Sequence, residues 1–202
     1  MYQEIKVRIK GLSPLLCQNR RLANPLDPIT KEIKRISGKR GKTDADMELL
    51  SRLEWLGGLY PSEPGTFEII ESGLKIEGFG VPCIPGEMIE ASIQAGARKH
   101  KLGKSFSAGL ICDGNWPLEY KGAKSIAALS LDDSFRDVRA VVIQGRTIMR
   151  TRPIFHGWEL GFTLSYLPEL INDQQVRDAL ALAGMIAGIG TYRPKYGRFS
   201  VL

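Results

Sequence analysis

The sequence Gly188-Ile-Gly-Thr-Tyr-Arg-Pro-Lys-Tyr-Gly-Arg-Phe-Ser-Val-Leu202 joins a predicted amphipathic helix to a predicted short strand. Its glycines let the backbone turn tightly and approach a ligand closely. Its cations suit a phosphate backbone, and its tyrosines offer ring faces on which bases stack. A helix C-cap at Gly188 followed by a tight turn is the alternative interpretation. We expect nucleic-acid contact from Gly188, Gly190, Tyr192, Arg193, Lys195, Tyr196, Gly197 and Arg198.

The segments around this loop predict an α+β fold. Residues 5–10 and 158–166 alternate between apolar and polar side chains, which is typical of half-buried strands. Helices are predicted after the capping residue Asn172 and after Ile84-Pro85-Gly86. The order strand, helix, strands, strand, helix, strand indicates a ferredoxin-like or RNA-recognition-type core, an antiparallel sheet with helices on one face.

Two insertions interrupt this predicted core. The first, residues 17–60, begins without periodicity and then forms a helix after a capping box at Thr43. The second, residues 136–153, predicts a projecting β-hairpin around Gln144-Gly145. We therefore expect one domain over residues 1–202 that carries a long basic insertion after its first strand and a thumb-like hairpin.

Positive charge is concentrated in four segments. Residues 17–43 hold eight Lys or Arg and two acids, and further cations cluster in residues 96–104, 136–152 and 190–198. The four segments together exceed the net charge of +6, so the rest of the chain is acidic. A basic face on an acidic body is expected of a protein that binds a polyanion. Outside the glycine-rich loop, the expected binding cations are Lys6, Arg8, Arg20, Arg21, Lys31, Lys34, Arg35, Lys39, Arg40, Lys42, Arg98, Lys101, Lys104, Arg139, Arg146, Arg150 and Arg152.

Cysteine usage and hydropathy predict a cytoplasmic protein. Cys17, Cys83 and Cys112 form no Cys-x-x-Cys pair, which argues against a zinc site or a disulfide framework and for a reducing compartment. No apolar run approaches the roughly 18 residues of a membrane span. The N-terminal strand has no signal-peptide core, so we expect no membrane association.

Cofactor chemistry is not expected either. The chain has two histidines and no Walker-type Gly-x-x-x-x-Gly-Lys-Ser/Thr motif. The Gly188-x-Gly190 pair follows a predicted helix, whereas a dinucleotide fingerprint follows a strand. We therefore predict no metal, ATP or dinucleotide cofactor.

Three segments occur in an order that points to a known family. They are Ile9-Lys-Gly-Leu-Ser-Pro-Leu-Leu16, Cys83-Ile-Pro-Gly-Glu-Met-Ile-Glu-Ala-Ser-Ile-Gln94, and Gly188-Ile-Gly190 with Gly197-Arg-Phe199. The set resembles the RAMP superfamily of CRISPR-associated proteins, in particular the Cas-seven-type backbone subunits. Glu87 and Glu90 stand where that pattern has small or basic residues. The short chain is more similar to compact, stand-alone relatives such as phage-encoded ones.

The resemblance implies a non-catalytic protein that polymerises head to tail along single-stranded DNA or RNA. Each subunit would hold the backbone on its core, while a thumb hairpin interrupts the bases. Met149 would then be an apolar wedge in the hairpin, and core packing is the alternative. Protection or annealing of strands would be an activity built on this binding.

Other functions stay open at the level of sequence. One alternative is a guide-RNA-binding effector backbone subunit. Some RAMP relatives cleave RNA with a histidine base or with an aspartate in the loop after the first strand, which makes His100, His156 and Asp27 candidate catalytic residues. An ordinary Asp-Pro turn is the structural interpretation of Asp27. A third alternative is a protein-interaction module whose cations dock an acidic partner.

Overall fold

The computed structural model describes residues 1–71, 73–143 and 145–202, with only the backbone of Ile143 and Arg146. Gln144, expected in the hairpin turn, and the Arg146 side chain, expected to bind, therefore lie outside the described residues. The fold is α+β, as predicted, with antiparallel sheets. The chain forms two compact units. Unit 1 comprises Met1–Leu16, Cys83–Lys121 and Phe155–Leu202, and unit 2 comprises Cys17–Pro82 and Gly122–Ile154.

Unit 1 is built on an antiparallel sheet in the order β11-β1-β10-β7-β5, with β6 also pairing with β10. The central pair is β1 and β10, in register with Val7 opposite Phe162. This order places the first strand between β10 and β11, the last two strands of the chain, as in a ferredoxin-like sheet. The strands of this sheet are β1 (Gln3–Gly11), β5 (Cys83–Pro85), β6 (Leu110–Ile111), β7 (Asn115–Glu119), β10 (Glu159–Tyr166) and β11 (Phe199–Val201). Unit 1 also contains β2 (Leu15–Leu16), which is not part of this sheet.

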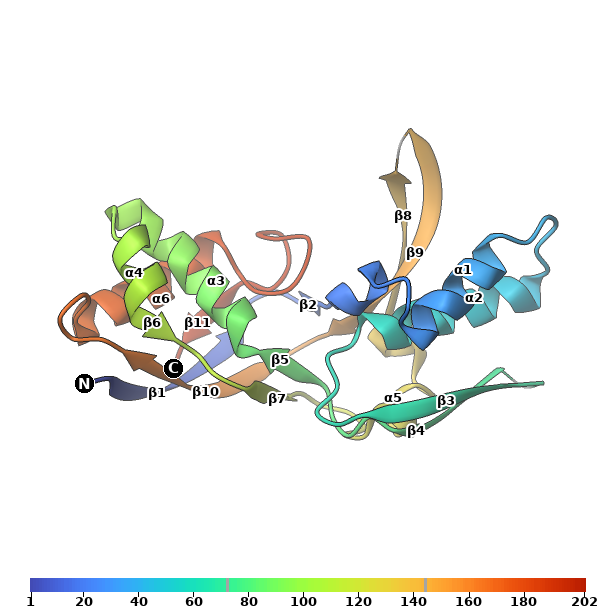
Figure 1. Cartoon of the computed structure of the whole chain (residues 1–202), viewed down its shortest axis with the longest axis horizontal. Helices are drawn as coiled ribbons and strands as arrows, with labels where there is room; N and C mark the ends of the chain where they lie inside the picture. Colours follow the sequence, from blue (N-terminus) through green and yellow to red (C-terminus); the bar gives the residue numbers. More distant parts are fainter. Residues whose placement is uncertain (72, 144) are drawn as a thin grey trace. The chain divides into compact units, whose positions relative to one another are not determined.

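The helices of unit 1 cover one face of this sheet, as the α+β prediction required (Figure 1). The longest are α3 (Gly86–Ala97) and α6 (Asp173–Ile186), and η2 (Arg98–His100) and α4 (Gly103–Gly109) continue from α3. The two long helices approach closely at Gly96, where an added Cβ would lie 2.2 Å from the carbonyl oxygen of Ala179. The alternating apolar residues of β1 and β10 are buried beneath them.

Unit 2 combines a helical pair with two β-hairpins. Helices α1 and α2 lie side by side, and the β8–β9 hairpin projects away from them (Figure 1). The Trp55 indole of α2 donates a 2.9 Å hydrogen bond to the Phe135 carbonyl in the core of the unit. The elements are η1 (Arg20–Ala23), α1 (Pro28–Ser37), α2 (Asp44–Gly58), β3 (Gly65–Ile70), β4 (Gly73–Gly78), α5 (Ile126–Leu129), η3 (Asp133–Phe135), β8 (Arg136–Ile143) and β9 (Arg146–Phe155).

The structure differs from the sequence prediction in the first insertion. Residues 17–43 were expected to be irregular, but α1 lies within them. Pro28 occupies the first turn and Asp27 caps the helix, and the apolar stripe buries Ile29 and Ile36. The compact unit also extends to Pro82 and includes residues 122–154, beyond the expected bounds of 17–60. The capping box at Thr43 and the hairpin strands β8 and β9 are confirmed.

Candidate nucleic-acid interface

The glycine-rich loop of unit 1 is closed at its base by its three glycines. Gly188, Gly190 and Gly197 all have positive φ, at 67°, 82° and 73°. A Cβ on Gly197 would lie 1.8 Å from the Ile189 carbonyl oxygen, and one on Gly190 would lie 2.4 Å from that of Leu16. Gly188 and Gly197 are buried. The glycines thus shape the base of the loop, and Gly190 also lines the groove beside it.

Backbone hydrogen bonds hold the loop against the start of the chain. The Ile189 amide donates to the Gly197 carbonyl at 2.9 Å, which joins the two sides of the loop. The Thr191 amide donates to the carbonyl of Leu16 at 2.9 Å, and the Gly197 amide donates to that of Pro14 at 2.8 Å. The exposed tip, Tyr192-Arg-Pro-Lys195, therefore projects from a fixed base.

A groove of about 740 Å³ lies between this loop and the C-terminal parts of α3 and α6. Its polar lining includes Gln94 and Arg98 of one helical segment and Tyr192 and Arg193 of the loop. Lys99 also lines it, so three cations and, among the described residues, no acid face the groove. No ion pair neutralises these three cations in the described part of the chain. We call this surface the loop groove.

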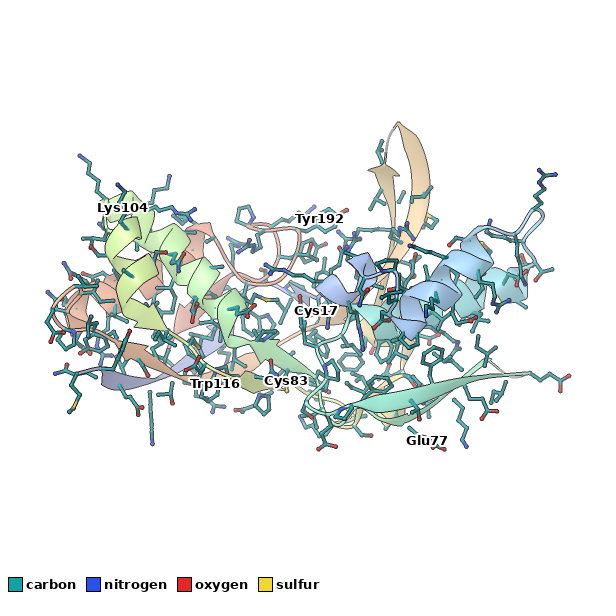
Figure 2. The ribbon with its side chains drawn as sticks, viewed as in Figure 1. Cys17, Glu77, Cys83, Lys104, Trp116 and Tyr192 are labelled. Carbon is teal, nitrogen blue, oxygen red and sulfur yellow. The ribbon has the colours of Figure 1, made fainter. Side chains whose placement is uncertain are left out.

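The Tyr192 ring is 41% exposed at the edge of the loop groove. Its place on the loop is marked in Figure 2. A partly exposed tyrosine beside unneutralised cations provides both a stacking face and phosphate ligands. Lys195 and Arg198 are exposed on the same loop outside the groove lining, and Tyr196 is half-buried.

Four predicted cations of unit 1 from other segments lie outside the loop groove. Lys6 and Arg8 alternate with the buried residues of β1 and so occupy the sheet face opposite the helices. Arg8 donates to Glu119 at 2.5 Å and to Glu159 at 3.0 Å, and these bonds raise the pKa of the guanidinium. Lys104 lies far along the helices from the loop (Figure 2), and Lys101 does not line the groove either.

The cations of unit 2 fall into two groups. Several are held by carboxylates, such as Lys39 by Asp46 at 2.5 Å, a contact that lowers the pKa of Asp46. The same is true of Arg21 with Asp27, Arg35 with Glu32, Arg139 with Asp137 and Arg150 with Glu54. Arg152 donates to Gln18 at 2.9 Å. Within the described ranges no ion pair involves Arg20, Lys31, Lys34, Arg40 or Lys42.

Asp27, the candidate catalytic aspartate, has two structural roles. Its Oδ1 accepts hydrogen bonds from the amides of Ile29 and Thr30, and its Oδ2 accepts one from Arg21 at 3.1 Å. It therefore caps α1 and fixes the preceding turn. His100 and His156 are exposed and, in the part of the chain that the structure describes, neither hydrogen bonds to a carboxylate.

We expect Asp27→Ala to lower the free energy of unfolding by about 1–2 kcal/mol, because it removes the helix cap together with the ion pair. Asp27→Asn should retain most of the stability, since asparagine also caps helices well. Urea unfolding of both variants measures the difference. A strand-cleaving activity lost in Asp27→Asn, with stability preserved, would show that the carboxylate has a role beyond this structural one.

The cysteines offer no reactive thiol. Cys17, Cys83 and Cys112 are free and buried. Burial raises the pKa of Cys17 and of Cys112 to about 12, so neither is a thiolate near neutral pH. Among the described residues, no group of His, Cys, Asp and Glu side chains is placed to hold a metal ion, and no helix is long and apolar enough to cross a membrane.

Comparison with known proteins gave no matching family model and no significant match among curated sequences. The case for this interface therefore depends on its geometry. Sequence reasoning missed Lys99 and Gln94, which line the loop groove with Arg98. Gln94 and Arg98 are four residues apart on one helical segment, and such residues share a helix face. This spacing was the signal in the sequence that could have placed Gln94 beside Arg98.

Proposed function

We propose that this protein binds single-stranded nucleic acid without sequence specificity and without cleaving it. The observation that carries the proposal is the loop groove, in which Arg98, Lys99 and Arg193 lie beside an exposed Tyr192. Cations that neutralise phosphates release counterions from the strand, and this release drives binding to any sequence. Stacking of a base on tyrosine is equally tolerant of sequence.

The open face of the sheet is a weaker candidate for strand binding. RNA-recognition domains stack bases on aromatic residues of that face. Here the corresponding positions of β10 are Gly161, Thr163 and Ser165, and Arg8 of β1 is neutralised by carboxylates. We therefore assign the strand to the helix-covered side of unit 1, along the loop groove.

We further propose that subunits assemble head to tail along the strand, as the likeness to Cas-seven-type proteins implies. The exposed apolar side chains of the hairpin support this: Val142 is 71% exposed and Met149 is 50% exposed. The exposure of Met149 argues against the core-packing interpretation. Asp44 and Glu48 of α2 line a hollow of about 330 Å³ together with Met149. An apolar surface with acidic neighbours suits a basic surface of a second copy.

Such a contact joins two different surfaces of neighbouring copies. Repeated copies would form an open filament if the rotation that relates each copy to the next does not close a ring. A protein-interaction module that docks another protein is the competing function, because the same apolar hairpin face would serve it. The two functions differ in whether nucleic acid is needed for assembly.

A salt series with labelled DNA and RNA single strands of about 40 nucleotides tests the proposal. We expect the logarithm of the binding constant to fall linearly with the logarithm of salt concentration, with similar affinity for strands of mixed sequence. Electron micrographs of the same samples should show helical particles that depend on the strand. Absence of binding at low salt would contradict the proposed function, and assembly with a protein partner alone would favour the competing one.

A further inference from the structure

Unit 2 contains a pocket of about 360 Å³ that is separate from the loop groove. Helix α1 contributes Ile33 and Lys34, and η1 contributes Leu22. Strand β9 contributes Arg150 and Arg152. The volume falls within the range of about 300–1,000 Å³ that small-ligand sites occupy. We call it the α1 pocket.

The charge of the α1 pocket is positive. Glu54 is the one acid that lines it among the described residues, and both of its oxygens are in use. Its Oε1 accepts from Arg150, and its Oε2 accepts a 2.8 Å hydrogen bond from the Thr151 amide. Lys34 and Arg152 also line the pocket, so its cations outnumber its one acid among the described residues and the pocket favours an anionic group.

The two cationic side chains differ in how firmly they are held. Arg152 is half-buried, and its Nε donates to the Gln18 side chain at 2.9 Å, which orients the guanidinium. Lys34 lies on the exposed side of α1 and forms no ion pair in the described portion of the chain. An anion at the mouth would therefore meet one oriented planar cation and one adaptable ammonium group.

The uncharged lining mixes polar side chains with the apolar Leu22 and Ile33, and this apolar part narrows the class of ligand. Leu22 and Ile33 are half-buried and present carbon surface, and Gly58 lets α2 pack closely, since a Cβ there would lie 2.7 Å from Pro153 Cδ. Inorganic phosphate alone would leave this surface uncovered, and a purely apolar molecule would leave the cations unused. A planar base joined to a phosphate uses both parts of the lining.

We infer that the α1 pocket binds one nucleotide unit, with the base against Leu22 and Ile33 and the phosphate on Lys34 and Arg152. This inference deepens the proposed function and rests on it for the source of the nucleotide, which is the bound strand. A free mononucleotide presents the same chemistry, so the test includes both sources.

The experiment compares the wild-type protein with Lys34→Gln, Ser37→Trp and Lys75→Gln. Ser37 is an exposed lining residue of α1, so a tryptophan there fills the mouth with little effect on the core. Lys75 is exposed in β4 of the same unit and does not line the pocket, so Lys75→Gln removes an equal charge as the matched control. The probes are adenosine 5′-monophosphate, measured by calorimetry, and a single strand that contains 2-aminopurine, measured by fluorescence. Inorganic phosphate is the control ligand.

We expect saturable binding of the mononucleotide, weakened about tenfold or more by Lys34→Gln and abolished by Ser37→Trp. Lys75→Gln should leave mononucleotide binding within about twofold, because exposed charges away from the ligand are screened. The change in 2-aminopurine fluorescence on strand binding should also be lost in Ser37→Trp, while most of the salt-dependent strand affinity persists.

Two outcomes separate this inference from the proposed function. If the strand binds with the expected salt dependence but the mononucleotide does not, and fluorescence is the same in the wild type and Ser37→Trp, the pocket inference is overturned and the proposed function stands. If the mononucleotide binds in a manner that depends on Lys34 but strands do not bind, the pocket is a site for free nucleotides and the proposed function fails.

Discussion

Replacing Arg98, Lys99 and Arg193 together by glutamine should weaken single-strand binding by about 100-fold or more at low salt. These three cations line the loop groove without neutralising acids in the described residues. Each phosphate contact on a single strand contributes about 0.7 to the salt slope, so the slope should fall by about 2. Fluorescence anisotropy with a labelled strand across a salt series measures both effects.

The matched control replaces Lys6, Lys121 and Arg177 by glutamine. These residues also belong to unit 1 and are exposed, but none of them lines the loop groove. The change in net charge is the same, so both triple variants alter the long-range field equally. The control should lose only a few-fold in affinity. Equal losses in the two variants would mean that binding depends on total charge, and the assignment of the strand to the groove would be wrong.

Gly197→Ala should lower the free energy of unfolding by about 3 kcal/mol or more. Its φ of 73° is unfavourable for alanine, and the new Cβ would lie 1.8 Å from the Ile189 carbonyl oxygen. Because that oxygen belongs to the backbone on the other side of the loop, relief requires the loop base to separate. Strand affinity should fall as well, since the same base fixes the loop tip. Urea unfolding and anisotropy measure the two effects.

Gly157→Ala is the matched control for backbone strain. Gly157 also has positive φ, at 56°, but an added Cβ would meet nothing within 4 Å. We expect Gly157→Ala to lower the free energy of unfolding by about 1–2 kcal/mol through backbone conformation alone, with strand binding unchanged. If both alanine variants lose the same stability, the close approach at Gly197 is not what closes the loop.

Local periodicity predicted the core of unit 1 well. The alternation of residues 5–10 and 158–166 corresponds to β1 and β10, and the predicted cap at Asn172 begins α6. The strand alternation and the helix cap are set by residues that are close together in the sequence, so the sequence alone reveals them. Helix α1 was missed because its polar face dominates the composition, although Ile29 and Ile36 are buried at helical spacing.

The site was harder to predict, because charge partners come from distant parts of the chain. Arg8 is neutralised by Glu119 and Glu159, and the latter is 151 positions away. Arg150 is held by Glu54 from another element of unit 2. A sequence shows where cations cluster, but not which of them already have a carboxylate within reach. Such pairs distinguish Arg8 and Arg150 from Arg98, Lys99 and Arg193 of the loop groove, which form no ion pair in the described residues.

The discontinuous make-up of the two units has a consequence for how the protein is synthesised. Unit 2 needs residues 122–154 to join residues 17–82, and β1 pairs with β10 and β11, which are made much later. A nascent chain therefore exposes the apolar face and the unpaired backbone of its first strand while most of the polypeptide emerges from the ribosome. Pairing between such distant segments is slow. Chaperones that shield the early strand should therefore improve the yield of native protein in cells.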